Sequence, residues 1–549
     1  MTLSRRRFLS TASLAAASLG SEAFSASSAL AQQVAPQKFK IPHPAPIETA
    51  APPMLNLSRL APFVDPLPIP PVLQATTLHP DPESPHHSLP CLRIAMRESS
   101  IPLHRDLPPT RLWTYSGQFP GPTIEARSGE PLLVRWINAL PYKHFLPIDH
   151  NLCGAEASNP EVRAVTHLHG GNVPHTSDGF PENWFTPGHD ALYRYPNHQQ
   201  AATLWYHDHA MGINRLNVYA GLAGLYLLRD SDEDALNLPR GNYEIPLVLV
   251  DRLLDRNAQL YYPTSGDPHA PWVPEVFGDI ILVNGKILPY LSVEPRKYRF
   301  RVLNAANARF FNISLSNGYE FHQIGSDQGL LARPLAAKVL TAAPAERLDL
   351  VVDFAPLDGQ TIRLVNDHAT PMMEFRVGRN PVQDPSSLPP QLRTIERTPE
   401  AAAIITRDLT LDEVETLQGQ PMRMLLNNTP WHAPVTETPR LGSTEIWRLI
   451  NLTDDTHPIH LHMVRFQVLD RRNLDIYKYR MYKQFLWTGS VTHPEPGEMG
   501  WKDTVRAFPG AVTRIIVRFD GYAGRYAWHC HLLEHESNEM MRPFEVLPA

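Results

Sequence analysis

The chain has 549 residues, of which 43% are apolar and 19% charged, so it is typical of a globular protein and too long for one hydrophobic core. Its formal net charge of -6 comes without a block of basic residues, which excludes a typical nucleic-acid binder. Loss of residues 1–31 would remove three arginines and one glutamate, a net +2, and leave a charge of -8.

Residues 1–31 are predicted to be an export signal. Arg5, Arg6 and Arg7 precede Phe8 and Leu9 in a pattern that resembles the bacterial twin-arginine consensus. A weakly apolar, Ala- and Ser-rich segment follows, and residues 29–31 offer a small-x-small cleavage site. The pattern predicts recognition by the twin-arginine export machinery, which carries folded proteins, and a periplasmic or extracellular location. No later run of about eighteen apolar residues appears, so we predict no membrane span.

Residues 32–75 are rich in proline and predict an extended arm or tether rather than a core element. Beyond the arm, short runs of β-forming residues recur, separated by turn residues. They include residues 132–136, 204–206, 222–228, 246–250, 280–283, 298–303, 348–354, 445–450, 465–469, 513–519 and 524–528. Because the 55 prolines also argue against long helices, we predict an all-β chain of β-sandwich or Greek-key barrel domains.

Two polar connections divide these strands into three groups. Residues 230–240 are charged, and residues 381–398 are polar and rich in proline. We therefore expect a first domain at 76–235, a second at 236–380, a linker at 381–398 and a third domain at 399–549.

The segment from His529 to Met540 places four metal-capable side chains and a thiol close together. Residues 524–528 before it read as a strand, on which side chains alternate between faces. His529 and His531 then point to one side and Cys530 to the other, so one backbone segment serves two metal environments. A thiolate with imidazoles and a thioether is the ligand set of a blue-copper site. The alternative is a His-rich surface loop with a buried cysteine.

Three further histidine motifs lie far away in the chain, at residues 167–169, 207–209 and 457–462. Alone, the first would more often be a strand pair or a zinc site, the second is a weak signal, and the third could be a turn. Together the four motifs supply eight paired imidazoles, two from each, which predict a multinuclear copper centre between domains. The eight are His167, His169, His207, His209, His460, His462, His529 and His531. The residues left over predict one mononuclear site: His457, Cys530, His535 and Met540.

These motifs resemble those of the multicopper oxidases with three cupredoxin-like Greek-key β-barrel domains. The resemblance is strongest to the bacterial spore-coat laccases, which share the bilirubin oxidase branch, and it extends from about Leu60 to the C-terminus. It includes stretches outside the histidine motifs: residues 107–113, 145–150, 215–221, 293–301 and 501–504.

The resemblance implies four copper ions per chain: one type 1, one type 2 and two type 3. It assigns the type 1 copper to His457, Cys530, His535 and Met540. It assigns the type 2 copper to His167 and His460. The type 3 pair would be held by His169, His207, His209, His462, His529 and His531. The axial methionine implies a moderate reduction potential.

The implied activity is laccase-type. A small aromatic reductant, a phenol, an aromatic amine or bilirubin, docks near His535 and gives up one electron at a time. Cys530 passes the electron toward His529 and His531, and O2 is reduced to water. Glu536 and Asp178 match acidic positions near the oxygen channel of this family and are candidate proton carriers, although an Asp-Gly turn and a solvated glutamate are the plain alternatives.

Several alternatives stay open. Related enzymes oxidise Cu(I) or Mn(II), and others are non-enzymatic scaffolds of the cell envelope that have lost copper ligands; the complete ligand set argues against the latter. Asp454 and Asp455 precede His457 and either border the substrate or are solvated turn residues. Cys91 and Cys153 could pair in an oxidising compartment. A monomer is the default expectation.

Overall fold

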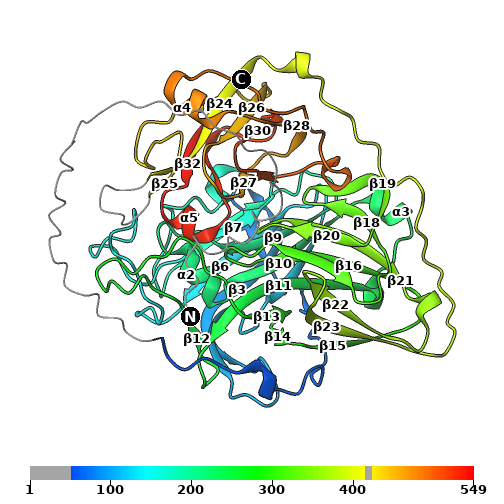
Figure 1. Ribbon diagram of the computed structural model, residues 1–549. Helices are drawn as coiled ribbons and strands as arrows, with labels where there is room; N and C mark the ends of the chain where they lie inside the picture. Colours follow the sequence, from blue (N-terminus) through cyan, green and yellow to red (C-terminus); the bar gives the residue numbers. More distant parts are fainter. Residues whose placement is uncertain (1–50, 415–422) are drawn as a thin grey trace, which may run out of the picture. The chain divides into compact units, whose positions relative to one another are not determined.

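Strands in paired sheets dominate the computed structural model, which describes residues 51–414 and 423–549 (Figure 1). The predicted export signal and the start of the Pro-rich arm lie outside the described residues. Helices in the described ranges are short: α2 (Asn214–Ala220), α3 (Ser231–Ala235), α4 (Ile476–Tyr482) and α5 (Leu533–Ser537). None of them is long and apolar enough to cross a membrane.

The first sheet pair is formed by residues 72–229. One sheet has the order β1 (Val72–Leu73), β5 (Gly121–Arg127), β10 (Ala223–Arg229), β9 (Ala202–Asp208) and β7 (Thr166–His169). The other contains β2 (Thr77–Asp81), β3 (Ser84–Ile101), β6 (Leu132–Ala139) and β8 (Asp190–Tyr195), with β4 (Thr110–Tyr115) paired to β3. Aromatic side chains of both sheets meet in one core, where Tyr115, Trp136 and Tyr206 are in ring contact.

The second sheet pair is formed by residues 244–377. Its larger sheet has the order β14 (Lys286–Ile287), β13 (Ile280–Val283), β11 (Glu244–Leu254), β16 (Lys297–Asn304), β21 (Arg347–Asp353), β18 (Phe321–Ser326) and β19 (Gly329–Ala337), with β12 (Leu260–Tyr261) on β11. The smaller sheet contains β15 (Tyr290–Val293), β23 (Thr370–Val377), β22 (Thr361–Asn366), β17 (Phe311–Leu315) and β20 (Val339–Ala342). Phe300 and Phe375, from opposite sheets, are in tilted ring contact in the core between them.

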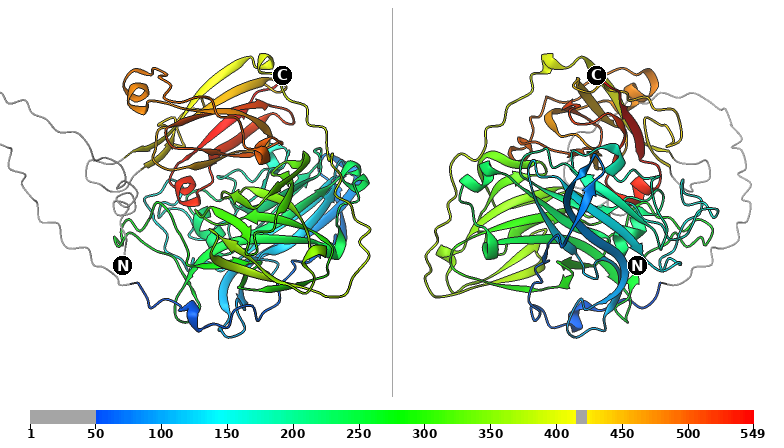
Figure 2. Two further views of the ribbon diagram at one scale, coloured as in Figure 1. Left: turned by 45° about the vertical axis from the view of Figure 1, so that its right-hand side comes forward. Right: turned by 180° about the vertical axis from the view of Figure 1, so that it is seen from behind.

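The third sheet pair is formed by residues 405–546 and is drawn from yellow to red in Figure 2. One sheet has β25 (Arg423–Leu426), β24 (Ile405–Val414), β26 (Thr444–Asn451), β30 (Ala511–Arg518) and β28 (Phe466–Asn473). The other has β29 (Thr504–Ala507), β27 (His457–Leu461), β31 (Gly524–Cys530) and β32 (Met541–Val546). Trp447 and Trp528 meet edge to face between the two sheets. The expectation of an all-β chain is confirmed.

The described part of the Pro-rich arm packs more closely than a tether. Phe63 and Leu67 are buried, and Leu67 belongs to the core of the second sheet pair. The Phe63 N–H donates to the Leu288 carbonyl, and Val72 begins a strand parallel to β5. Proline removes backbone donors, but two apolar side chains and edge pairing suffice to anchor this segment.

Cys91 and Cys153 are both free thiols. Cys91 is buried on β3, whereas Cys153 lies half-buried in the chain between β6 and β7. The structure does not contain the disulfide that the sequence left open.

Candidate metal centres

Strand register brings the four histidine motifs together in two neighbouring sheets. In the first sheet pair, β7 and β9 run antiparallel and place His167 beside His207. In the third, β27 and β31 place His460 beside His529, and Ile459 beside Cys530. Because neighbouring residues of a strand face opposite sides, β31 separates its histidine from its cysteine, as the sequence predicts.

Three imidazoles from distant parts of the chain converge on one point. The Nε2 atoms of His209, His462 and His529 form a triangle with every side 3.2 Å long. A point at the centre of such a triangle lies roughly 2 Å from each nitrogen, which is the usual metal–imidazole distance. All three side chains are fully buried.

The hydrogen bonds on the far side of two of these rings indicate that their convergent nitrogens carry lone pairs. His462 Nδ1 donates to Asp178 Oδ2 at 2.8 Å, and His529 Nδ1 donates to the Cys530 carbonyl at 3.1 Å. A neutral imidazole that donates through Nδ1 has an acceptor at Nε2. Lone pairs cannot hydrogen-bond to each other, so this triangle fits a cation.

The other five paired histidines surround a second space beside the triangle. His169, His207 and His531 form one group with ligand atoms within 4.8 Å, and His167, His169 and His460 form another. His167 Nδ1 donates to the Asp178 carbonyl at 2.6 Å and His460 Nδ1 to the Asp503 carbonyl at 2.8 Å. Buried nitrogens of all five lack a hydrogen-bond partner: His167 Nε2, His169 Nδ1, His207 Nε2, His460 Nε2 and both nitrogens of His531. This donor set fits two more metal ions.

The mononuclear site lies on the other face of β31. Cys530 Sγ is 3.5 Å from His457 Nδ1 and 4.0 Å from His535 Nδ1, and the two nitrogens are 3.3 Å apart. Helix α5 carries His535, and after it the Met540 N–H donates to the His535 carbonyl while the Cys530 N–H donates to the Met540 carbonyl. The side chains of His457, Cys530 and His535 thus come together, and the chain turns back so that the backbone of Met540 binds that of Cys530; all four residues are fully buried.

Burial strongly raises the pKa of the Cys530 thiol, because the charged thiolate is poorly solvated there. A thiolate at this position requires a bound cation, and a coordinating thiol loses its proton outright. Without a cation this environment favours the neutral thiol, so a bound metal would have to supply the charge that holds Cys530 as a thiolate.

The two predicted acidic residues contact the histidine cluster. Burial strongly raises the pKa of Asp178, whose Oδ2 accepts from His462. Glu536 Oε2 lies 3.1 Å from His529 Nδ1, and its Oε1 lies 3.3 Å from His209 Nδ1. Burial raises the pKa of Glu536, but the adjacent imidazoles more than offset this and hold the pKa below its usual range.

Sequence reasoning missed residues that fix the ligands. Asp208, between His207 and His209, is fully buried and accepts from the Val165 and Ala210 N–H groups and from the Asn217 amide. It thereby ties the end of β9 to the start of β7 and to α2. Its position inside a His-x-His motif was visible, but nothing in the sequence showed what it would bind.

A second missed group lies behind His457. The Thr453 hydroxyl is 2.6 Å from His457 Nε2, and the Glu413 carboxylate is 3.8 Å from the same nitrogen. Asp454 is exposed and Asp455 half-buried on the loop that leads to His457. Thr453 and Glu413 therefore contact this ring from its far side, whereas Asp454 reaches solvent.

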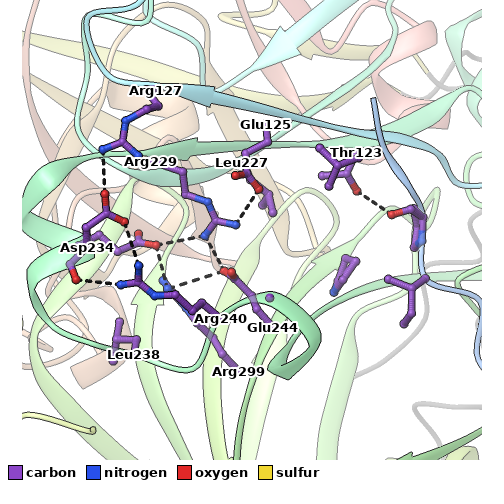
Figure 3. A pocket seen from close by; sticks show the side chains of 16 residues that line it. Thr123, Glu125, Arg127, Leu227, Arg229, Asp234, Leu238, Arg240, Glu244 and Arg299 are labelled. Atoms are coloured by element: carbon purple, nitrogen blue, oxygen red, sulfur yellow. Dashed lines mark hydrogen bonds and ion pairs between the residues drawn. The ribbon is translucent and has the colours of Figure 1, made fainter. Parts of the chain in front are cut away.

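A separate cavity of about 550 Å³ lies between the first and second sheet pairs (Figure 3). It is lined by charged side chains that pair with one another, such as Arg229 with Glu244 at 2.8 Å and Arg299 with Glu233 at 2.8 Å. No histidine of the clusters lines it. The ion pairs that line this cavity form an ionic seam between the two sheet pairs, and the histidine clusters lie elsewhere.

Comparison with known proteins agrees with the site. Two family models, both described as multicopper oxidase, match residues 99–149 with 159–233 and residues 402–549. The chain is 46% identical over 511 residues to the laccase of Bacillus subtilis strain 168, covering 88% of this chain and 98% of the relative. It is 37% identical over 513 residues to multicopper oxidase LPR1 of Arabidopsis thaliana, covering 83% and 88%.

Solved structures show the same architecture. The laccase from Pediococcus acidilactici aligns with a TM-score of 0.71 at 27% identity, covering 89% of this chain and 95% of the other. The multicopper oxidase McoA from Aquifex aeolicus also aligns at 0.71 and 27%, covering 88% and 99%.

Paired β-sheets and buried imidazole clusters beside a cysteine define a cupredoxin-like metalloenzyme of the oxidoreductase class. The chain belongs to the multicopper oxidase family. Its cofactor is copper, four ions of types 1, 2 and 3. The sequence-based predictions of the family, the cupredoxin-like fold, oxidase activity and copper are confirmed.

Proposed function

We propose that the protein is a laccase-type oxidase that couples one-electron oxidation of phenols and aromatic amines, bilirubin among them, to reduction of O2 to water. The observation that carries this proposal is the division of β31. Cys530 faces His457 and His535, while its chain neighbours His529 and His531 face the larger cluster. Relatives that bear the name laccase, at 46% identity, support the substrate class.

We propose the following ligand sets, which the donor geometry supports. The type 1 copper is held by His457, Cys530, His535 and Met540. The type 2 copper is held by His167 and His460. The type 3 pair is held by His169, His207, His209, His462, His529 and His531. When bound, copper would allow the type 1 site to accept single electrons and the cluster to reduce O2 by four electrons.

The polypeptide itself orients the copper ligands and shields the path of the electron from solvent. Only the peptide units around Cys530 separate the cysteine from its two neighbouring histidines, so an electron passes along covalent bonds rather than through solvent. Burial of every imidazole excludes water from the cluster. The reducing substrate meets the surface nearest His535, and because this ring is itself fully buried, the side chains that cover it determine which aromatic compounds approach.

Glu536 and Asp178 belong to the same proposal as carriers of protons for O2 reduction. Their carboxylate oxygens lie within 3.1 Å of His529 Nδ1 and 2.8 Å of His462 Nδ1. Glu536→Gln keeps the shape but cannot carry a proton at Oε2, so O2 uptake should fall roughly 100-fold or more while copper content stays complete. Normal uptake in a fully copper-loaded variant would remove Glu536 from the mechanism.

The central test is O2 uptake by copper-loaded protein with four reductants in turn: a phenol, bilirubin, Cu(I) and Mn(II). Uptake with the phenol and a blue absorption band are expected. Uptake only with a metal ion would identify a metallo-oxidase, the alternative function. A protein without the blue band and without uptake would contradict the proposal, and would leave only a non-enzymatic scaffold.

Export by the twin-arginine machinery to the periplasm or cell exterior, a monomeric state and the three domains 76–235, 236–380 and 399–549 complete the proposal. The strand groups of the three sheet pairs support these domain limits. The Arg5-Arg6 pair supports the export route.

A further inference from the structure

The second sheet pair supplies none of the paired histidines, yet one of its side chains lies under the cluster. Arg347, the first residue of β21, is fully buried, and all five of its guanidinium N–H groups have acceptors. Nε donates to the Thr203 carbonyl at 2.8 Å and Nη1 to the Ala345 carbonyl at 2.8 Å. Nη2 donates to the Asp327 carbonyl at 3.1 Å.

The remaining two N–H groups bind Asp503 of the third sheet pair as a fork. Nη1 donates to Asp503 Oδ1 at 2.9 Å, and Nη2 donates to Oδ2 in a short contact. Such a bidentate arginine–carboxylate pair fixes the carboxylate in both position and plane. Thr203 belongs to β9, the strand that carries His207, so Arg347 joins all three sheet pairs at one point.

Asp503 in turn contacts two of the metal-binding rings. Its Oδ1 accepts from His169 Nε2 at 3.1 Å, which leaves His169 Nδ1 as the lone pair that faces the cluster. Its main-chain carbonyl accepts from His460 Nδ1 at 2.8 Å. One residue thus sets the tautomer and orientation of one histidine from the first sheet pair and one from the third.

Gln328 also binds the Asp503 carboxylate and links it to the backbone after His169. Its Nε2 donates to Asp503 Oδ2 at 2.7 Å and to the carbonyl of Gly170, the residue after His169, at 2.8 Å. Gly170 has φ +84°, and a Cβ there would lie 2.6 Å from Asp503 Oδ2. The backbone after His169 therefore packs directly against the carboxylate, without room for a side chain.

We infer that Arg347 is a positioning residue for the three-copper cluster. By binding the Asp503 carboxylate it orients His169, and by fixing Asp503 it also positions the main-chain carbonyl that accepts from His460. The sheet pair that provides no ligand thus determines the geometry of a site between the other two. The inference rests on the proposed copper cluster and extends it to a residue that binds no metal.

The test compares Arg347→Lys with Arg301→Lys in the full-length, copper-loaded protein. Arg301 is a matched control because it is also buried, belongs to the same large sheet and contacts the Thr203 hydroxyl at 3.0 Å, but it binds Glu233, Glu244 and Asp349 instead of Asp503. Lysine keeps the charge of either residue but cannot make the fork.

In Arg347→Lys we expect copper retention by the cluster during dialysis against a chelator to be roughly 10–100-fold weaker, with altered hyperfine splitting in the type 2 electron paramagnetic resonance signal. The blue type 1 band should be unchanged. Arg301→Lys should keep the wild-type signal and retention. Equal retention and identical spectra in the two variants would overturn the inference.

A second variant covers the case in which Arg347→Lys does not fold. Asp503→Asn keeps one carbonyl oxygen for His169 but loses the charge that binds the arginine, and it should show the same change in type 2 signal and retention. Wild-type behaviour of Asp503→Asn would also overturn the inference. Wild-type protein that binds no copper would instead contradict the proposed function, so the two failures are distinguishable.

Discussion

At the scale of single residues, Cys530 joins the two centres. Cys530→Ser removes the soft ligand while the core of the third sheet pair remains, so we expect a folded protein that has no blue absorption band and no oxidation of a phenol. Absorption spectra, circular dichroism and O2 uptake check this. Cys91→Ser is the control, because Cys91 is a buried thiol on β3 outside both centres and its variant should stay blue and active. Turnover by the Cys530 variant would contradict the electron route.

Asp208 is expected to matter for stability as well as for ligand position. Asp208→Ala leaves the buried Val165 and Ala210 N–H groups and one N–H of the Asn217 amide without their acceptor, at about 1–3 kcal/mol for each buried donor. Denaturant unfolding should show that the free energy of unfolding falls by about the sum of these three losses. Asp358→Ala, at an exposed site, should change the unfolding free energy by less than about 0.5 kcal/mol. Similar values for both variants would refute the role given to Asp208.

Residue patterns predicted the ligands but not what holds them. Each His-x-His pair is a local feature, since two positions on one strand share a face whatever the tertiary structure. The contact of Arg347 with Asp503 joins residues far apart in the chain and depends on how two sheet pairs dock. Asp503 lies in a stretch that resembles the family, but the sequence alone gave it no partner. Thr453 and Glu413 behind His457 were missed for the same reason.

At the scale of elements, the turn after the first histidine strand is tightly packed. Gly179 has φ +80°, and a Cβ there would lie 2.2 Å from the Thr166 carbonyl and 2.7 Å from His167 Cα. Gly179→Ala should therefore displace β7, lower the unfolding free energy by more than the ~1–2 kcal/mol cost of a left-handed alanine, and reduce copper content.

The control for this substitution separates packing from backbone strain. Gly318 has φ +71° with nothing within 4 Å of the position of a Cβ, so Gly318→Ala has only the conformational cost. Metal analysis and denaturant unfolding of the two variants make the comparison. If Gly318→Ala loses as much stability and copper as Gly179→Ala, the crowding at β7 is not the cause.

Strands were predictable and short helices were not. In β6, buried residues alternate with less buried ones from Val134 to Ala139, as packing of one sheet face against a core requires. Helix α4 contains three tyrosines, whose intrinsic helix propensity is modest, and its start is fixed by a cap: Asp475 accepts from the Lys478 N–H. The sequence predicted an extended arm or tether at residues 32–75 from its proline content, and this pattern did not indicate that Phe63 and Leu67 within it would be buried.

At the scale of the whole molecule, a buried ionic seam joins the first and second sheet pairs. Burial raises the pKa of Glu244, but Arg301, Arg299 and Arg229 outweigh it and lower the pKa to about 2. A carboxyl whose folded pKa lies below its unfolded value of about 4.5 stabilises the fold above that pH. The stabilisation is lost as the pH falls through the folded value.

We therefore expect Glu244→Gln to destabilise the protein at neutral pH by about 3–5 kcal/mol, because it leaves buried arginines underpaired. The free energy of unfolding of the variant should also fall less steeply than that of the wild type between about pH 4.5 and pH 2. Urea unfolding across that range measures both. Asp520→Asn, in an exposed pair with Arg518, is the control and should leave the curve unchanged. Parallel curves for wild type and Glu244→Gln would contradict the assignment.

The larger cluster takes its imidazoles from two sheet pairs, and this bears on when the complete metal site can form. Four of its imidazoles belong to the first sheet pair and four to the third, whereas the four residues proposed for the type 1 site all belong to the third. Since domains generally fold in order of synthesis, we expect the four imidazoles of the first sheet pair to come together before the four of the third. The complete set of eight, and with it the selective copper site, should therefore form only after the C-terminal sheets have docked.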